Sequence, residues 1–121
     1  MSSETLHEDA AALGPEVIDQ HRAFTSLIEE LEAVDWYNQR AKATVDDELR
    51  AILEHNRDEE KEHAMMVLEW LRRHDPKLEE NMRKYLFNAK PPLEVEAAAG
   101  QGGGSGDGGL AIGDLREEVR K

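Results

Sequence analysis

The chain has 121 residues and a mass of 13.7 kDa, which allows one ordinary domain. Acidic residues outnumber basic ones 27 to 15, for a formal net charge of −12, so nucleic acid and anionic membrane surfaces are unfavourable partners while metal cations are favourable ones. The absence of cysteine excludes disulfides, thiolate metal sites and cysteine nucleophiles, and the polar N-terminus and lack of a long apolar run predict a cytoplasmic protein without signal peptide or membrane span.

Two long helices account for the strong periodicity of the chain. Residues 1–14 are acidic and are predicted to form a flexible arm. Pro15 suits the first turn of a helix, and apolar residues then recur at helical spacing to about residue 40. The second helix is predicted to begin at a capping box, with Thr44 as N-cap and Asp47 at position N3, and to end near residue 74.

The rest of the chain divides into three parts. Asp75 and Pro76 restart a short third helix, which completes a helical domain over residues 15–90. Residues 91–109 begin with two prolines and are rich in glycine after position 100, a composition that predicts a flexible linker. Residues 110–121 regain apolar positions.

The predicted fold class is all-α, because no segment shows the alternation of a strand. Its main unit is an antiparallel two-helix hairpin, followed by a short C-terminal helix. A single hairpin buries only one side of its apolar stripe, and the other side would face water. We therefore expect two hairpins to pair antiparallel and to complete a four-helix bundle by dimerisation.

Glu60 and His63 lie inside the apolar stripe of the second helix. Leu53, Glu60 and Val67 are spaced by seven residues, and His63 belongs to the neighbouring line. A carboxylate in such a stripe is costly unless it is paired or bound to a metal. Residues i and i+3 share a helix face, so Glu60 and His63 can converge on one ion. The alternative reading of this pattern is a plain buried polar pair.

The first helix offers Glu30 at the edge of its apolar stripe, with Tyr37 two turns further along the same side. Taken alone, Glu30 reads as a solvated flanking charge. Di-iron sites of helix bundles, however, take a Glu from each of two helices and Glu-x-x-His from each of the other two. One copy of the chain holds half of that set, and a two-fold dimer would hold all of it. The oxygen-rich ligands favour Fe or Mn, with Zn²⁺ as the alternative.

Several strings of the sequence resemble the encapsulated ferritin family. They are EELEAVDWY at 29–37, HNRDEEKEHA at 55–64, LEWLRR at 68–73 and YLF at 85–87. The string GDGGLAIGDLR at 106–116 is similar to the localisation peptide that docks cargo inside encapsulin shells. The resemblance implies a ferritin-like bundle made from two-helix protomers, a ring of dimers such as a decamer, and docking to a shell through residues 110–121.

The same resemblance implies the activity and the residues that carry it. The protein would oxidise Fe(II) to Fe(III) at a di-iron ferroxidase site between two protomers, and the shell would hold the iron mineral. The family's ferroxidase residues correspond here to Glu30, Glu60, His63 and Tyr37. A second metal-binding position near the opening of the ring corresponds to Glu29 and Glu32, beside Trp36.

The residues alone do not exclude two other functions. The helices could form a non-enzymatic oligomeric adaptor that the tail tethers to a partner, with Glu60 and His63 as a salt-bridged pair. The chain could also be another di-metal helical protein that handles oxygen or peroxide. Saturable Fe(II) oxidation that depends on Glu60 separates these functions. His55, Glu59 and Glu62 also share one face and could attract metal, although a solvated acidic face explains them as well.

Overall fold

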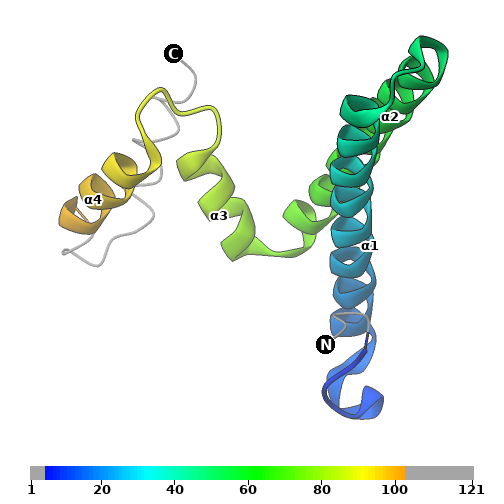
Figure 1. The fold of residues 1–121 in the computed structure, drawn as a ribbon. Helices are drawn as coiled ribbons and strands as arrows, with labels where there is room; N and C mark the ends of the chain where they lie inside the picture. Colours follow the sequence, from blue (N-terminus) through cyan, green and yellow to red (C-terminus); the bar gives the residue numbers. More distant parts are fainter. Residues whose placement is uncertain (1–4, 103–121) are drawn as a thin grey trace. The chain divides into compact units, whose positions relative to one another are not determined.

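The computed structural model describes residues 5–102, and this part of the chain is helical without strands, which confirms the predicted all-α class (Figure 1). Its helices are α1 (Ala10–Ala43), α2 (Asp47–His74), α3 (Pro76–Tyr85) and α4 (Pro92–Gly102). They belong to two compact units, a hairpin unit that ends at His74 and a C-terminal unit that begins at Asp75. Among the described residues, no helix has both the length and the hydropathy that a membrane crossing needs.

The hairpin unit consists of α1 and α2, which lie side by side and run in opposite directions (Figure 1). The backbone N–H of Thr44 donates to the Arg40 carbonyl at 3.0 Å and ends α1. The Asp46 carboxylate accepts a hydrogen bond from the backbone N–H of Leu49 at 2.8 Å, so Asp46 is the N-cap of α2. The prediction of Thr44 as the N-cap is therefore wrong. Its hydroxyl instead accepts from the Asp46 backbone N–H at 3.2 Å, inside the turn.

Arg50 ties the first turn of α2 to the end of α1. Its Nε donates to the Ala41 carbonyl at 3.2 Å, and its Nη2 donates to the Thr44 carbonyl. Its Nη1 also donates to the Asp47 carboxylate at 2.7 Å. The last carbonyls of a helix accept no hydrogen bond from within the helix, so the Arg50 side chain satisfies two such carbonyls at the end of α1 and in the turn.

The N-terminal end of α1 is interrupted at Gly14, whose φ of 81° lies in the left-handed region that glycine tolerates. The straight part of the helix begins at Pro15, as predicted. Part of the arm that we predicted as flexible is nevertheless helical, because residues 10–13 form a turn of α1. The Ala12 N–H donates to the Asp9 carbonyl at 2.9 Å. Three consecutive alanines favour this turn, because alanine has the highest helix propensity of all residues.

The hairpin unit buries few apolar side chains. Ala41, Ala64 and Leu71 are at most 3% exposed. Large apolar side chains remain 40–51% exposed along both helices, among them Val17, Phe24, Ile28, Leu31, Leu49 and Ile52. A single hairpin therefore leaves much of its apolar stripe in water, as the sequence indicated; the pairing of two hairpins stays a prediction.

The C-terminal unit opens with the short helix that the sequence predicted. The Asp75 carboxylate caps α3 by accepting from the Leu78 backbone N–H at 3.0 Å, and Pro76 occupies its first turn. The Leu86 N–H donates to the Met82 carbonyl at 2.9 Å at its end. Phe87 follows with a φ of 59° and a side chain that is 88% exposed.

The prediction of a flexible linker is wrong for residues 92–102, which form α4. Pro92 starts the helix, three alanines at 97–99 favour its continuation, and Val95 is 1% exposed. The run of alanines outweighs the effect of the nearby prolines and glycines here. Residues 103–109 of the linker and the peptide at 110–121 lie outside the described residues.

Candidate metal centre

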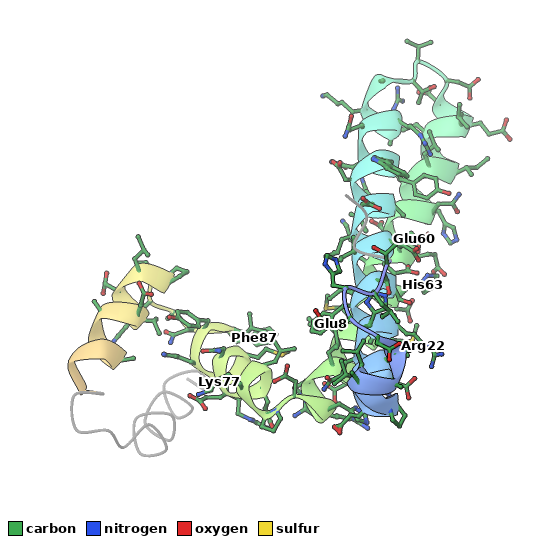
Figure 2. All side chains as sticks on the ribbon, turned by 90° about the horizontal axis from the view of Figure 1, so that it is seen from below. Glu8, Arg22, Glu60, His63, Lys77 and Phe87 are labelled. Atoms are coloured by element: carbon green, nitrogen blue, oxygen red, sulfur yellow. The ribbon has the colours of Figure 1, made fainter. Side chains whose placement is uncertain are left out.

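Glu30 of α1 meets Glu60 and His63 of α2 in the hairpin unit. Figure 2 labels Glu60 and His63 on this unit. One ligand atom from each of the three side chains lies within 4.8 Å of the other two. Within residues 5–102, no other three His, Asp or Glu side chains come together in this way. The structure thus brings together the three residues that the sequence predicted for the ferroxidase site, and not Glu29 and Glu32 of the second predicted metal position.

The α-helical backbone sets the geometry of the pair on α2. Glu60 and His63 are one turn apart, and His63 Nδ1 lies 3.0 Å from Glu60 Oε1. His63 Nδ1 also lies 3.4 Å from Glu30 Oε2 of α1. The residue after His63 is Ala64, which has no exposed surface. Its small side chain permits the close approach of the two helices that this contact requires.

The three side chains are partly open to solvent in a single hairpin. Their exposed fractions are 27% for Glu30, 25% for Glu60 and 44% for His63. The sequence placed Glu60 and His63 inside a buried stripe, and one hairpin achieves only part of that burial. The remaining open side is the side on which a second chain could add ligands.

The three groups shift one another's pKa. Hydrogen bonding with Glu60, together with partial burial, raises the pKa of the Glu30 carboxyl group. Hydrogen bonds from Glu30 and His63 lower the pKa of the Glu60 carboxyl group. The hydrogen bond with Glu60 raises the pKa of the His63 imidazole. The negative charge of Glu60 therefore favours protonation of Glu30 and His63, and a cation placed among the three groups would offset the same negative charge.

The residues fit a metal ion. Glu30 Oε2 is a buried oxygen with no hydrogen-bond partner among the described residues, which is unfavourable unless another positive group satisfies it. For three atoms that are 4.8 Å apart, the upper limit found here, the equidistant point lies about 2.8 Å from each. Carboxylate and imidazole ligands bind metals at about 2.0–2.2 Å, so side-chain shifts below about 1 Å would complete the coordination.

The other residues predicted for the site do not join this group. Tyr37 is partly exposed, and the guanidinium of Arg40 lies over its ring at 5.6 Å from the centroid. Glu29 and Glu32 are exposed on α1, and Trp36 nearby is 51% exposed. Their predicted roles depend on neighbouring chains and stay predictions.

The acidic patch on α2 is also solvent-exposed. His55, Glu59 and Glu62 are all exposed, and they belong to no group of three converging ligands within the described part of the chain. This geometry agrees with the reading of a solvated acidic face.

The sequence did not single out Asn38 and Arg57, which connect the two helices beside the metal group. Arg57 Nη1 donates to Asn38 Oδ1 at 3.1 Å. Arg57 precedes Glu60 by one helical turn, and this spacing was the available signal. Its partner on α1 could not be read from spacing, because the register between two helices is a property of their packing.

The chain is similar to proteins of one family along most of its length. The family model described as EncFtn-like matches residues 5–89. The "Encapsulated ferritin-like protein" of Rhodospirillum rubrum is 53% identical over 129 aligned positions, which cover 98% of this chain and 92% of the relative. The "Ferritin-like protein" of Thermotoga maritima is 48% identical over 110 positions, which cover 91% of this chain and 96% of the relative.

A solved structure agrees with these matches. The crystal structure of a Nitrosomonas europaea protein superposes with a TM-score of 0.69 and 58% sequence identity. The superposition covers 71% of this chain and 96% of that protein.

Proposed function

The chain belongs to the EncFtn-like family, and we propose that it is a ferroxidase, which oxidises Fe(II) to Fe(III) at Glu30, Glu60 and His63. The observation that carries the proposal is the convergence of two carboxylates and one imidazole, with a buried carboxylate oxygen that accepts no hydrogen bond among the described residues. Such an oxygen-rich set with one nitrogen ligand suits iron. In this proposal iron is the substrate, because the ferric product leaves the site.

We propose that two hairpins pair across this site to form a ferritin-like four-helix bundle. Each chain contributes one Glu from α1 and Glu-x-x-His from α2, which is half of the set that bundle di-iron sites use. Leu49 and Ile52 precede His63 by 14 and 11 residues, so they project on the same side of α2, and both are about half exposed. A second chain would cover these apolar side chains and the open side of the metal group together.

The charges of the site support oxidation of bound iron. Both carboxyl groups must be ionised and His63 must be neutral at its ligating nitrogen for the iron to bind. The carboxylates stabilise Fe(III) more than Fe(II), because Fe(III) has the higher charge. Each Fe(II) gives one electron to an oxidant, which we take to be dioxygen. We assign Glu60 as the carboxylate that bridges two iron ions, since it interacts with both Glu30 and His63.

The assembly provides the remaining roles. We propose that dimers associate into a ring, such as a decamer, and that Glu29 and Glu32 bind metal near its opening beside Trp36. Both carboxylates are exposed and one helical turn apart on α1, so they are accessible to incoming iron. Tyr37 is proposed to line the ferroxidase site once the second chain is present.

We propose that residues 110–121 dock the protein inside an encapsulin shell, which stores the ferric product. The support is the name of the Rhodospirillum rubrum relative, "Encapsulated ferritin-like protein", and an alignment that covers 98% of this chain and so extends into this peptide. Leu110, Ile112 and Leu115 supply apolar anchors for a groove on the shell. A ring carries one peptide per chain, so many weak contacts would act together.

A stopped-flow assay tests the activity. Protein prepared without oxygen is loaded with increasing Fe(II) and mixed with air-saturated buffer, and the ultraviolet absorbance of Fe(III) is followed. We expect a fast phase that saturates at about one Fe(II) per chain. His63→Ala should abolish this phase, and His55→Ala, on the exposed face, should retain it. Oxidation that never saturates, or that survives His63→Ala, would contradict the proposal.

A further inference from the structure

The distances within the metal group depend on how α1 is placed along α2. Glu30 is on one helix, and Glu60 and His63 are on the other, so a slide of α1 changes two ligand separations at once. Metal sites tolerate errors of only about 0.2 Å in ligand distance. Something in the hairpin must therefore hold the two helices in register near this group.

The fully buried side chains provide little of that restraint. The buried side chains Ala41 and Ala64 carry a single methyl group each, and Leu71 is two turns beyond His63. Small side chains allow close contact between helices but present no large projection that would resist sliding. The Arg50 contacts hold the turn, which is about three helical turns away from Glu60.

Arg57 and Asn38 supply a directional contact much closer to the site. Arg57 is one turn from Glu60, and its Nη1 donates to Asn38 Oδ1 across the hairpin at 3.1 Å. Its Nε donates to the Asp58 carboxylate at 3.0 Å, and its side chain is only 21% exposed. The planar guanidinium therefore links Asn38 to α2 through a rigid fork, which the flexible ammonium of lysine cannot reproduce.

The hydrogen bond between Arg57 and Asn38 is formed over a distance range of the same order of magnitude as the tolerance of a metal site. A hydrogen bond between nitrogen and oxygen is favourable over a range of about 0.5 Å, from about 2.7 to 3.2 Å. While the bond between Arg57 and Asn38 is formed, it opposes a slide of α1 along α2 near the metal group. The comparable bond from Gln20 Nε2 to the His74 carbonyl, 2.9 Å long, lies ten residues from Glu30 and controls the far end of the hairpin.

We propose that Asn38 and Arg57 form a positioning pair for the metal group, which fixes the register of Glu30 against Glu60 and His63. The inference rests on the proposed function, because it assumes that these three side chains bind a metal. Neither member of the pair contacts the ion in this proposal; both act through the placement of the helices.

Titration of the full-length protein with Co²⁺ tests the pair, because the visible spectrum of bound Co²⁺ reports both occupancy and coordination geometry. Asn38→Ala and Arg57→Lys should each weaken Co²⁺ binding about tenfold and change the spectrum, as loss of a supporting contact does at other metal sites. The double variant should bind no more weakly than the weaker single variant, because the two residues act as one unit. Asn38→Asp keeps an acceptor for Arg57 and should retain the wild-type spectrum.

Gln20→Ala is the matched control, because it removes a similar bond between the same helices at the far end. We expect it to change Co²⁺ affinity less than twofold with an unaltered spectrum, and circular dichroism should show equal helix content in all variants. Unchanged binding in the pair variants, additive losses in the double variant, or an equal loss in Gln20→Ala would overturn the positioning role. If the wild type bound no Co²⁺, or Glu60→Gln bound it as tightly as the wild type, the metal site itself would be wrong.

Discussion

Replacement of Glu60 by Gln removes one negative charge from the metal group and keeps the size of the side chain. At about 2.8 Å from the centre of the group, a unit charge and a divalent cation interact by about 3 kcal/mol even with the dielectric constant of bulk water. We therefore expect metal affinity to fall about 100-fold. This value is a lower limit, because the Glu60 side chain is only 25% exposed and its surroundings screen less than water.

Isothermal titration with Co²⁺, performed without oxygen, measures the change. Glu59→Gln is the matched control, because it removes the same charge from the adjacent, exposed position on α2. Salt and solvent screen an exposed charge, so we expect Glu59→Gln to weaken binding less than about threefold at ordinary ionic strength. The ratio of the Co²⁺ affinities of the two variants distinguishes the loss of a metal ligand from the loss of a charge that only attracts cations to the acidic chain.

The melting temperature of the protein without added metal is expected to respond to Glu60→Gln in the opposite direction from metal affinity. Glu60 and Glu30 crowd two carboxyl groups together, so Glu60→Gln should leave the melting temperature unchanged or raise it. Equal Co²⁺ affinity in the two variants would refute the assignment of Glu60 as a ligand. A large fall in melting temperature for Glu60→Gln would show that its main role is structural.

Other expectations concern pH, assembly and the tail. The pKa of His63 is raised by its hydrogen bond with Glu60 and that of Glu30 by its hydrogen bond with Glu60, so protons compete with the metal for both groups and Co²⁺ affinity should fall as pH drops, measured by titration at several pH values. If dimerisation completes the site, Co²⁺ should shift size-exclusion profiles from monomer toward larger species at concentrations where the protein otherwise dissociates. Two arginines lower the pKa of Glu69 to about 2, below its ordinary value of 4.5, so Glu69→Gln should reduce the melting temperature above pH 4.5 and lose this effect as pH falls toward about 2. Deletion of residues 110–121 should leave Fe(II) oxidation intact and abolish co-purification with a co-expressed encapsulin shell.

Local patterns in the sequence were sufficient to predict the two candidate ligands on α2. Seven-residue spacing placed Glu60 inside an apolar stripe, and the three-residue step to His63 gave the pair that the structure shows at 3.0 Å. The partner on α1, Glu30, followed from the chemistry of bundle metal sites rather than from its own spacing. The N-cap of α2 was missed because both Thr44 and Asp46 are good caps, and only the turn decides which one reaches the helix.

Contacts between elements were harder to predict, because sequence spacing carries no information about register. The bond between Asn38 and Arg57 depends on the axial placement of two helices, which small buried alanines leave undetermined in the sequence. The helix α4 was not predicted for a different reason. Its alanines favour a helix while the nearby prolines and glycines disfavour one, so the composition of the segment is ambiguous. Burial of Val95 within the folded chain favours the helix, and burial is not visible in composition.

The thin core of the hairpin and the crowded charge of its metal group point to one coupled equilibrium. The hairpin unit buries only Ala41, Ala64 and Leu71 while large apolar side chains stay half exposed, so folding of one chain recovers little of the available hydrophobic free energy. Glu30 and Glu60 add a repulsive term that a cation would remove. A second hairpin would cover the apolar face and complete the ligand set in one step. Metal binding, dimerisation and folding would then stabilise one another, and each would be weak alone.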